Sequence, residues 1–201
     1  MNYLAHTFLS QGDEEVLIGN FIADFINAKQ ARMMDEPYQR GIELHRKIDS
    51  YTDKHLEFRK GTKRLSKYHS KYSPVVLDIL YDHLLAVNWG QYAHVSLEIH
   101  AQNTYAIFEN HMDAFLDQGV EHIPRMIEHD FLSSYADVDK VKYVLSRMDL
   151  RTRFASQFVN AMDHLHEDYG FYNAEFNLFL PDILKMVKEQ AVENSFLIVS
   201  K

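Results

Sequence analysis

The sequence predicts an all-helical protein that folds as a single domain over residues 1–201. Only seven Gly and four Pro interrupt the chain, and apolar residues recur with the helical period in every window long enough to test. There is no linker, internal repeat or low-complexity segment. A length of 201 residues also suits one domain, because domains commonly contain roughly 100–200 residues.

The first half of the chain carries three helix signals in order. A short apolar helix is expected around His6, in MNYLAHTFL. Asp13, Glu14 and Glu15 precede the apolar stretch 16–26, where acids favour the positive end of a helix dipole. Pro37 then suits the first turn of a third helix, which we expect to continue to about Asp53.

Two further helices are predicted downstream. Ser73 followed by Pro74 is typical of an N-cap with proline at the first helical position, and this helix should run to about Trp89. Later, apolar residues recur at the i, i+4, i+7, i+8 and i+11 positions of a one-sided structural helix. They are Phe154, Phe158, Ala161, Met162 and Leu165.

Composition excludes several classes of protein. The 46% apolar content, with thirteen Phe and twelve Tyr, indicates a folded chain and not a disordered one. Without cysteine there is no disulfide and no thiolate nucleophile, so a metal would need His, Asp, Glu or Asn ligands. The start of the chain lacks signal-peptide features, and no run is long enough to span a bilayer. We therefore expect a soluble cytoplasmic protein that does not act at a membrane.

The charge of the chain is unevenly distributed. The net charge of −8 argues against a nucleic-acid partner, since binding phosphates requires clustered Lys and Arg. Between Lys54 and Tyr72, however, seven Lys or Arg accompany a single acid, Glu57. This segment is therefore a basic surface on an otherwise acidic protein.

Three acids lie in helices that are otherwise apolar. In SPVVLDILYDHLLAVNW, Asp78 and Asp82 stand four residues apart, with His83 on a neighbouring flank, and the helix is apolar on almost every side. Asp24 occupies a similar position in VLIGNFIADFI, four residues after Asn20. A buried carboxylate is costly unless a cation or hydrogen-bond donors compensate it. Metal ligation and salt bridges to neighbouring helices both remain open for these acids.

A third segment, GIELHRKIDSYTDKH, gathers polar groups opposite its apolar stripe. His45, Arg46, Asp49 and Asp53 share this face, and the periodicity alone favours a solvated surface. The i, i+4 spacing of His45 and Asp49 would equally suit two ligands, or a ligand and a proton acceptor. His6 lies on a short apolar helix, a setting in which a hydrogen-bonded core histidine is more common than a ligand.

The sequence also narrows the possible chemistry. Its glycines are isolated, which excludes a P-loop and a dinucleotide fingerprint, and there is no Gly-x-Ser-x-Gly elbow. The catalytic option that agrees with several buried His and Asp residues is water activated by a metal ion. This interpretation favours hydrolysis and does not name a substrate.

In order along the chain, four strings resemble the acyl carrier protein phosphodiesterase family: MNYLAH, GNFIADF, GIELHRKIDSYTDKH and DILYDHLLAVNW. The likeness continues more loosely through SRMDLRTRF into the C-terminal part. It implies removal of the 4'-phosphopantetheine arm from holo-acyl carrier protein, with a divalent cation that is usually manganese. It also implies a helical bundle related to the HD phosphohydrolases, although the doublet here is Asp82-His83 and reverses the His-Asp order.

The resemblance also implies roles for particular residues. Arg46 is expected to contact the phosphate, and Asp49 or His83 to handle the proton. The expected pool of metal ligands is His6, Asp24, His45, Asp78 and Asp82.

The basic segment is a candidate docking surface for the carrier protein, which is small and acidic. Several of its cations can share one helical face; the alternative is a solvated helix without a partner. The surface comprises Arg59, Lys60, Lys63, Arg64, Lys67 and Lys71. Two alternative functions also remain: hydrolysis of a nucleotide or other small phosphodiester, and a helical interaction module that has lost catalysis.

Overall fold

The computed structural model describes residues 1–10, 12–150 and 157–199, with side chains to residue 190. Within these ranges every regular element is a helix, which confirms the predicted all-helical class. The first elements are α1 (Tyr3–Leu9), α2 (Glu14–Ile22), α3 (Ala28–Met33), α4 (Glu36–Lys54) and α5 (Leu56–His69). A 3-10 turn, Ser70–Tyr72, leads into α6 (Ser73–Val87).

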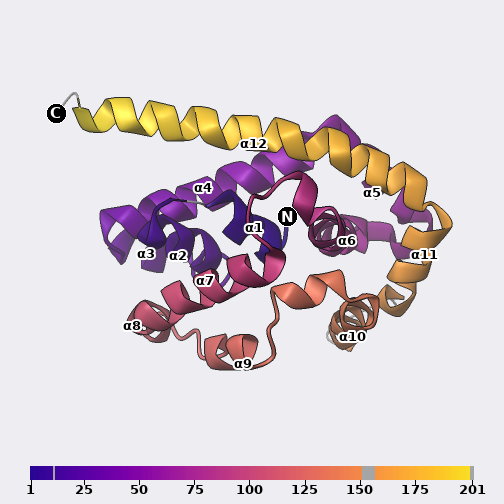
Figure 1. Ribbon diagram of the computed structural model, residues 1–201, viewed down its shortest axis with the longest axis horizontal. Helices are drawn as coiled ribbons and strands as arrows, with labels where there is room; N and C mark the ends of the chain where they lie inside the picture. The colour runs from indigo at the N-terminus through magenta and orange to yellow at the C-terminus, as the bar shows by residue number, and fades with distance from the viewer. Residues whose placement is uncertain (11, 151–156, 200–201) are drawn as a thin grey trace.

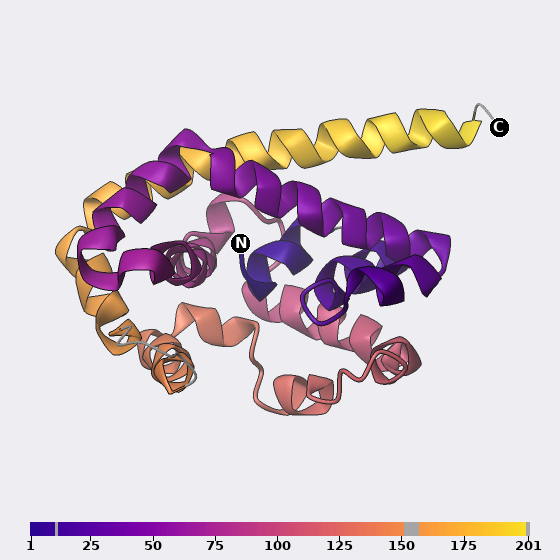
Figure 2. The same cartoon turned by 180° about the vertical axis from the view of Figure 1, so that it is seen from behind.

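The second half is built from shorter helices and one long one. They are α7 (Leu97–Asn110), α8 (Met112–Leu116), α9 (Ile123–Glu128), α10 (Val138–Asp149), α11 (Ala161–Glu167) and α12 (Tyr169–Val199). In Figure 1, α12 runs along the top of the molecule, and the N-terminus lies near the centre. The view from behind shows α4 and α5 lying beside α12 (Figure 2).

Helix α6 is the centre of the core. Its residues from Ile79 to Ala86 are all buried, and the apolar ones among them join one hydrophobic cluster with side chains from both halves of the chain. No helix among the described residues is long and apolar enough to cross a membrane. The prediction that α6 is a helix apolar on nearly all sides is confirmed. Because it is packed on nearly all sides, the surrounding helices fix its position.

Two glycines allow α2 and α4 to cross at unusually short range. A Cβ added at Gly19 would lie 2.1 Å from the carbonyl oxygen of Tyr38, and one added at Gly41 would lie 2.2 Å from that of Val16. Both distances are impossible for a real side chain. The crossing therefore requires glycine at both positions, and it holds the site residues of the two helices together.

Several helix boundaries differ from the sequence prediction. Helix α2 ends at Ile22, and α6 ends at Val87 before a 3-10 turn that begins at Trp89. Ser73 is not the N-cap, because the preceding 3-10 turn leads directly into α6 and the Ser73 hydroxyl donates to the carbonyl of Ser70. The predicted helix through Phe158 and Leu165 is broken by Gln157, whose φ of 51° is left-handed. Phe154 lies outside the described residues.

Candidate metal centre

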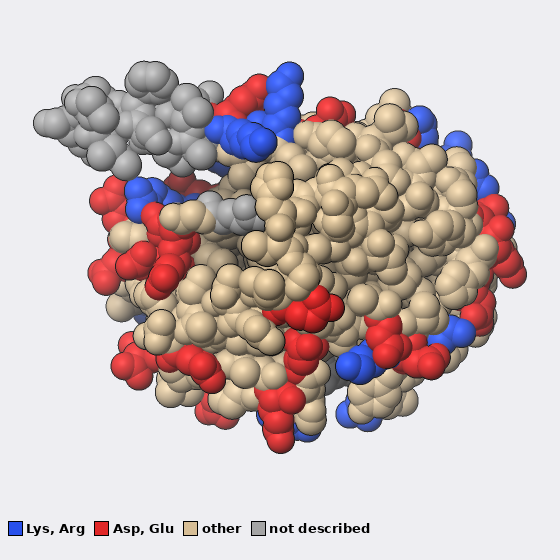
Figure 3. All heavy atoms as spheres, viewed as in Figure 1, with Lys and Arg blue, Asp and Glu red and all other residues tan. Residues whose placement is uncertain are grey.

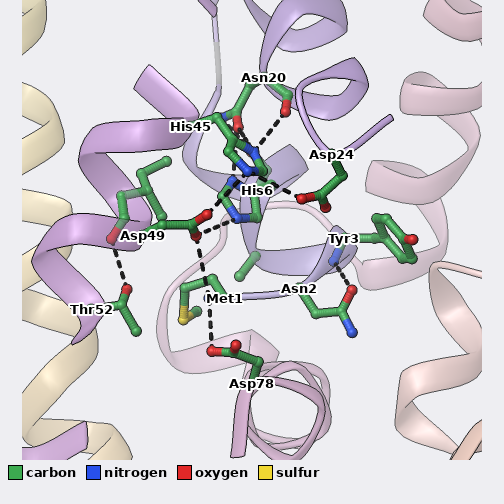
Figure 4. Close-up of polar contacts among 12 residues, drawn as sticks. Met1, Asn2, Tyr3, His6, Asn20, Asp24, His45, Asp49, Thr52 and Asp78 are labelled. Carbon is green, nitrogen blue, oxygen red and sulfur yellow. Dashed lines mark hydrogen bonds and ion pairs between the residues drawn. The ribbon is translucent and has the colours of Figure 1, made fainter. Parts of the chain in front are cut away.

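Four side chains from the first four helices and their connections meet at one point, and we call them the His-Asp centre. They are His6 of α1, Asp24 just after α2, and His45 and Asp49 of α4 (Figure 4). His45 Nε2 lies 3.1 Å from Asp49 Oδ2 and 3.3 Å from Asp24 Oδ1, and His6 Nε2 lies 3.3 Å from Asp49 Oδ1. One ligand atom from each of His6, His45 and Asp49 can be chosen within 4.8 Å of the others, a spacing that suits a metal ion.

Asn20 of α2 orients both imidazoles. His6 Nδ1 lies 2.8 Å from Asn20 Oδ1, and His45 Nδ1 lies 2.9 Å from the Asn20 carbonyl oxygen. The Asn20 amide nitrogen donates to Ser10 Oγ and to the carbonyl of His6, which sets the orientation of the amide. Both oxygens accept, so both Nδ1 atoms carry a proton, and each Nε2 atom has a lone pair whenever its ring is neutral.

When the two rings are neutral, their Nε2 atoms are therefore poorly matched to their surroundings in the absence of a cation. A lone pair that faces a carboxylate oxygen at 3.1–3.3 Å is repelled unless a proton or a metal ion lies between them. His6 Nε2 is buried and, among the described residues, has no partner with hydrogen-bond geometry. This orphaned nitrogen, 3.3 Å from Asp49 Oδ1 in a centre that also contains Asp24, fits a divalent cation bound among these groups.

The electrostatics of the centre separate the two histidines. Burial lowers the pKa of His6 despite the contact with Asp49. Burial opposes charge on His45 as well, but Asp24 and Asp49 outweigh it and raise its pKa to about 9. Burial would raise the pKa of Asp49, whereas His45 and His6 hold it well below its usual value. In the metal-free protein, the proton shared across the centre therefore resides on His45.

The predicted solvated face of α4 is wrong at its most important position. His45 is only 6% exposed, because the α2–α4 crossing carries the Asn20 carbonyl onto its ring. The side chains of Asp24 and Asp49 are each a little over 40% exposed, so the centre opens to solvent on its carboxylate side. Such an opening would admit a substrate.

Asp78 and Asp82 meet a different partner, the start of the chain. Asp82 accepts from the backbone amides of Leu4, Asn2 and Ala5 at 2.8, 3.3 and 3.4 Å, and so caps α1. Burial raises the pKa of Asp82 to about 7 against the opposing effect of these donors and the Met1 ammonium. Asp78 Oδ1 accepts from the Met1 ammonium at 2.8 Å, and that ammonium lies 3.6 Å from Asp49 Oδ1 (Figure 4). The two acids therefore support α1 and, through Met1, one side of the centre.

His83 and Arg46 occupy separate positions. The His83 ring is buried and its Nδ1 donates to the Tyr135 carbonyl at 2.8 Å; no contact found among the described residues links it to the centre. Burial lowers the pKa of His83. Arg46 is exposed and lines an open groove of about 640 Å³ between α4 and α12, next to the centre because it follows His45 in α4. Asp53 is exposed near the end of α4.

Two groups of this site are not predicted from the sequence. The sequence pattern shows Asn20 only as the polar residue four positions before Asp24, although its side chain and backbone orient both histidines. The Met1 ammonium is a backbone group, so no side-chain pattern in the sequence indicates its role. The polar interruption of an apolar helix at Asn20 is the feature that could reveal its role, because a buried amide needs partners.

The basic segment becomes α5 with one concave surface, which we call the basic hollow. Its walls are Lys60, Lys63, Arg64, Lys67 and Phe171. The Arg64 guanidinium lies 3.4 Å above the Phe171 ring and pairs with Asp168 at 3.1 Å. Lys71 falls in the 3-10 turn after α5, and Arg59 is exposed outside the walls. By contrast, the face drawn in Figure 3 carries acidic groups along its left and lower parts.

Fold and site together define a class: an all-helical protein whose N-terminal helices build a half-open histidine–aspartate centre. The profile of the family described as acyl carrier protein phosphodiesterase matches residues 1–183. The chain belongs to the acyl carrier protein phosphodiesterase family.

Relatives of full length agree with this assignment. A protein of Pectobacterium atrosepticum named acyl carrier protein phosphodiesterase is 25% identical over 198 residues, covering 94% of this chain and 99% of the relative. Proteins of the same name from Photorhabdus laumondii and Shigella boydii are each 26% identical and cover 94% and 96% of this chain, and 96% and 100% of their own lengths. No solved structure matches, so the relation to HD phosphohydrolases stays a prediction.

Proposed function

We propose that this protein is a divalent-metal-dependent phosphodiesterase that releases 4'-phosphopantetheine from holo-acyl carrier protein. The observation that carries the proposal is the pair of Nε2 atoms on His6 and His45, which face the carboxylates of Asp49 and Asp24 while Asn20 occupies both Nδ1 atoms. Membership of the family supports the carrier protein as substrate.

The proposed ligands are His6, His45, Asp49 and Asp24. Two imidazoles and two carboxylates form a mixed nitrogen and oxygen set, which suits Mn²⁺ and other borderline divalent cations. When bound, such a cation supplies an activated nucleophile and stabilises charge on the phosphoryl oxygens. Asp78 and Asp82, also expected as ligands, are better supported as the groups that hold α1 and the Met1 ammonium in place.

The remaining roles follow from position. Arg46 is exposed one residue after His45, so its guanidinium can reach a phosphate oxygen from the groove side of α4. Asp49 is the better supported proton acceptor of the two expected candidates, because His83 is buried against the Tyr135 carbonyl. Asp49 also contacts both histidines, so its carboxylate sets their separation.

The basic hollow is the proposed docking surface for the carrier protein. Carrier proteins are acidic, and an acidic enzyme repels them unless a local positive field steers the encounter. Lys63 and Lys67 are exposed in this hollow, while Arg64 is anchored by Asp168 and Phe171. Neither lysine has an acid partner among the described residues, although the Lys67 ammonium lies 4.4 Å from the centroid of the Tyr68 ring, so both are placed to meet a partner's carboxylates.

The reaction is tested by mass spectrometry. Purified protein is incubated with holo-acyl carrier protein and Mn²⁺, and we expect the carrier to lose the mass of 4'-phosphopantetheine. EDTA should stop the reaction and added Mn²⁺ restore it. An unchanged holo mass with folded, metal-loaded protein contradicts the proposal. The absence of bound metal in wild type, H6A and D49N alike would favour a non-catalytic module.

The docking surface is tested by charge reversal. Lys63→Glu with Lys67→Glu should raise KM for the carrier protein at least tenfold and reduce the salt dependence of turnover. The matched control reverses two exposed cations of α3, Lys29 and Arg32, which lie at the opposite end of the molecule from α5 in Figure 1. Equal KM values in the two double variants would contradict docking at the hollow. If neither variant affects a small aryl phosphodiester, the chemistry itself is intact.

A further inference from the structure

A second cavity, of about 350 Å³, lies beside α1 and is lined by aromatic, aliphatic and polar side chains. Its wall includes Thr7 of α1, Trp89, Tyr92, and His100, Asn103 and Thr104 of α7. No Asp, Glu, Lys or Arg lines it among the described residues, although a quarter of the chain is charged. The wall histidines are His94 and His100, and a charged group placed in this cavity would find no Asp, Glu, Lys or Arg as counter-ion, which favours an uncharged ligand.

The polar groups of this cavity have defined hydrogen-bonding roles. The Thr7 hydroxyl donates to the Leu4 carbonyl at 2.9 Å, so His100 Nε2, at 3.2 Å, is the donor to Thr7 Oγ1. Burial lowers the pKa of His100 to about 4, which leaves the ring neutral at physiological pH. A neutral imidazole protonated at Nε2 keeps an acceptor lone pair on Nδ1. Together with the amide of Asn103, the wall therefore offers both a donor and an acceptor to an amide group.

The position of the cavity relates it to the His-Asp centre. Thr7 follows His6 directly in α1, so the two side chains project about 100° apart from the same helix. His6 faces Asp49, and Thr7 faces His100. A helix is about 10 Å across with its side chains. A ligand that reaches from the centre to this cavity must therefore be a flexible chain longer than that.

We propose that this cavity holds the uncharged pantetheine part of the substrate while the phosphodiester lies at the His-Asp centre. The inference rests on the proposed function, which supplies the substrate. Pantetheine is an uncharged chain with two amides and a hydroxyl, and its length equals about four extended residues, or roughly 14 Å. The aromatic and amide groups of the wall match this composition, whereas the cationic groove at Arg46 does not.

The chain contains its own reporter for this proposal, because Trp89 is the only tryptophan and lines the cavity. Metal-free protein in EDTA is titrated with dephosphorylated pantetheine while Trp89 fluorescence is followed. We expect a saturable change that mercaptoethanol at equal concentration does not produce. Asn103→Phe, at an exposed position of the wall, should weaken binding at least tenfold. Gln102→Phe, exposed on α7 but outside the wall, is the matched control.

Activity provides a second, independent readout. Asn103→Phe should raise KM for holo-acyl carrier protein, whereas Gln102→Phe, outside the wall, should leave it near the wild-type value. No saturable signal with wild type, or equal pantetheine affinity in the two Phe variants, overturns the inference. If wild type binds pantetheine and hydrolyses no carrier protein, the proposed function fails and the cavity assignment stands. If the carrier protein is hydrolysed but pantetheine does not bind, the cavity assignment fails and the proposed function stands.

Discussion

The imidazole rings of His6 and His45 are stacked, with their centroids 4.2 Å apart and an angle of 18° between their planes. Two imidazoles at this distance cannot both carry a positive charge without strong repulsion. Their Nδ1 atoms both point to Asn20, and their Nε2 atoms both point to carboxylates. The pair is thus arranged to present two nitrogen ligands in the same direction.

Removal of either histidine should abolish tight metal binding. We expect His6→Ala and His45→Ala to weaken Mn²⁺ affinity at least tenfold by isothermal titration calorimetry, because each removes one nitrogen ligand. Asp53→Asn, at an exposed position of α4, is the control and should bind as wild type does. Wild-type affinity in both alanine variants would mean that the metal site lies elsewhere.

Asn20→Leu should lower Mn²⁺ affinity by about 10- to 100-fold although Asn20 is not a ligand. Groups that fix the tautomer and orientation of a ligating histidine commonly have effects of this size. The physical reason is that the His6 Nδ1 proton loses its acceptor, Asn20 Oδ1, whereas His45 Nδ1 loses only its 3.2 Å contact to that atom and keeps the Asn20 backbone carbonyl. Nitrogen chemical shifts measured by NMR should therefore show mixed tautomers for the His6 ring. Unchanged shifts would refute the orienting role.

Metal binding should strengthen with pH between about 7 and 9. His45 is protonated below its raised pKa of about 9, and it must lose that proton before Nε2 can bind a cation. Affinity should therefore rise up to tenfold per pH unit until the pKa is passed. The stability of the metal-free protein should depend on pH in the opposite direction. The ion pairs of His45 stabilise the fold fully below pH 6.5, and this contribution is lost as the pH rises through 9. A flat calorimetric pH profile would contradict the assignment.

Gly41→Ala should destabilise the protein and impair the centre. The added Cβ would lie 2.2 Å from the Val16 carbonyl oxygen, so α2 and α4 must separate. We expect a loss of about 1–3 kcal/mol or more in the free energy of unfolding, together with weaker Mn²⁺ binding, because Asn20 moves away from His45. Gly90→Ala is the control, since nothing lies within 4 Å of its added Cβ. Equal melting temperatures of the two variants would contradict the close crossing.

Glu175→Gln should stabilise the protein at alkaline pH. Glu175 is 4% exposed and neither carboxylate oxygen has a partner among the described residues. Burial raises its pKa to about 7, so the folded state holds a proton that the unfolded state releases near pH 4.5. Stability from this group is present below pH 4.5 and is lost as the pH rises through 7. Thermal unfolding at pH 5 and pH 8 should show a smaller difference for the glutamine variant than for wild type.

The sequence by itself determined the helical class, the buried character of α6 and the presence of a buried carboxylate, Asp82, within it. These features follow from local rules: the 3.6-residue period, helix-start residues and the cost of placing a carboxylate in an apolar helix. The expectation that Asp24 is also buried in an apolar helix is wrong, because α2 ends at Ile22 and the Asp24 side chain is 44% exposed. The sequence could not determine which acids meet which histidines. His6, Asp24 and His45 are far apart in the chain, and each alone agrees with a structural role.

Tertiary structure decided the centre through one close helix crossing. Gly19 and Gly41 allow α2 and α4 to approach until the Asn20 carbonyl reaches His45, which buries this histidine on a polar face that periodicity marks as solvated. Packing also gives the acids different partners. The start of α1 lies against α6, so Asp82 accepts from backbone amides, whereas Asp24 and Asp49 contact His45. Local pattern limits what a residue can do, whereas the partner that faces it is set by packing between distant segments.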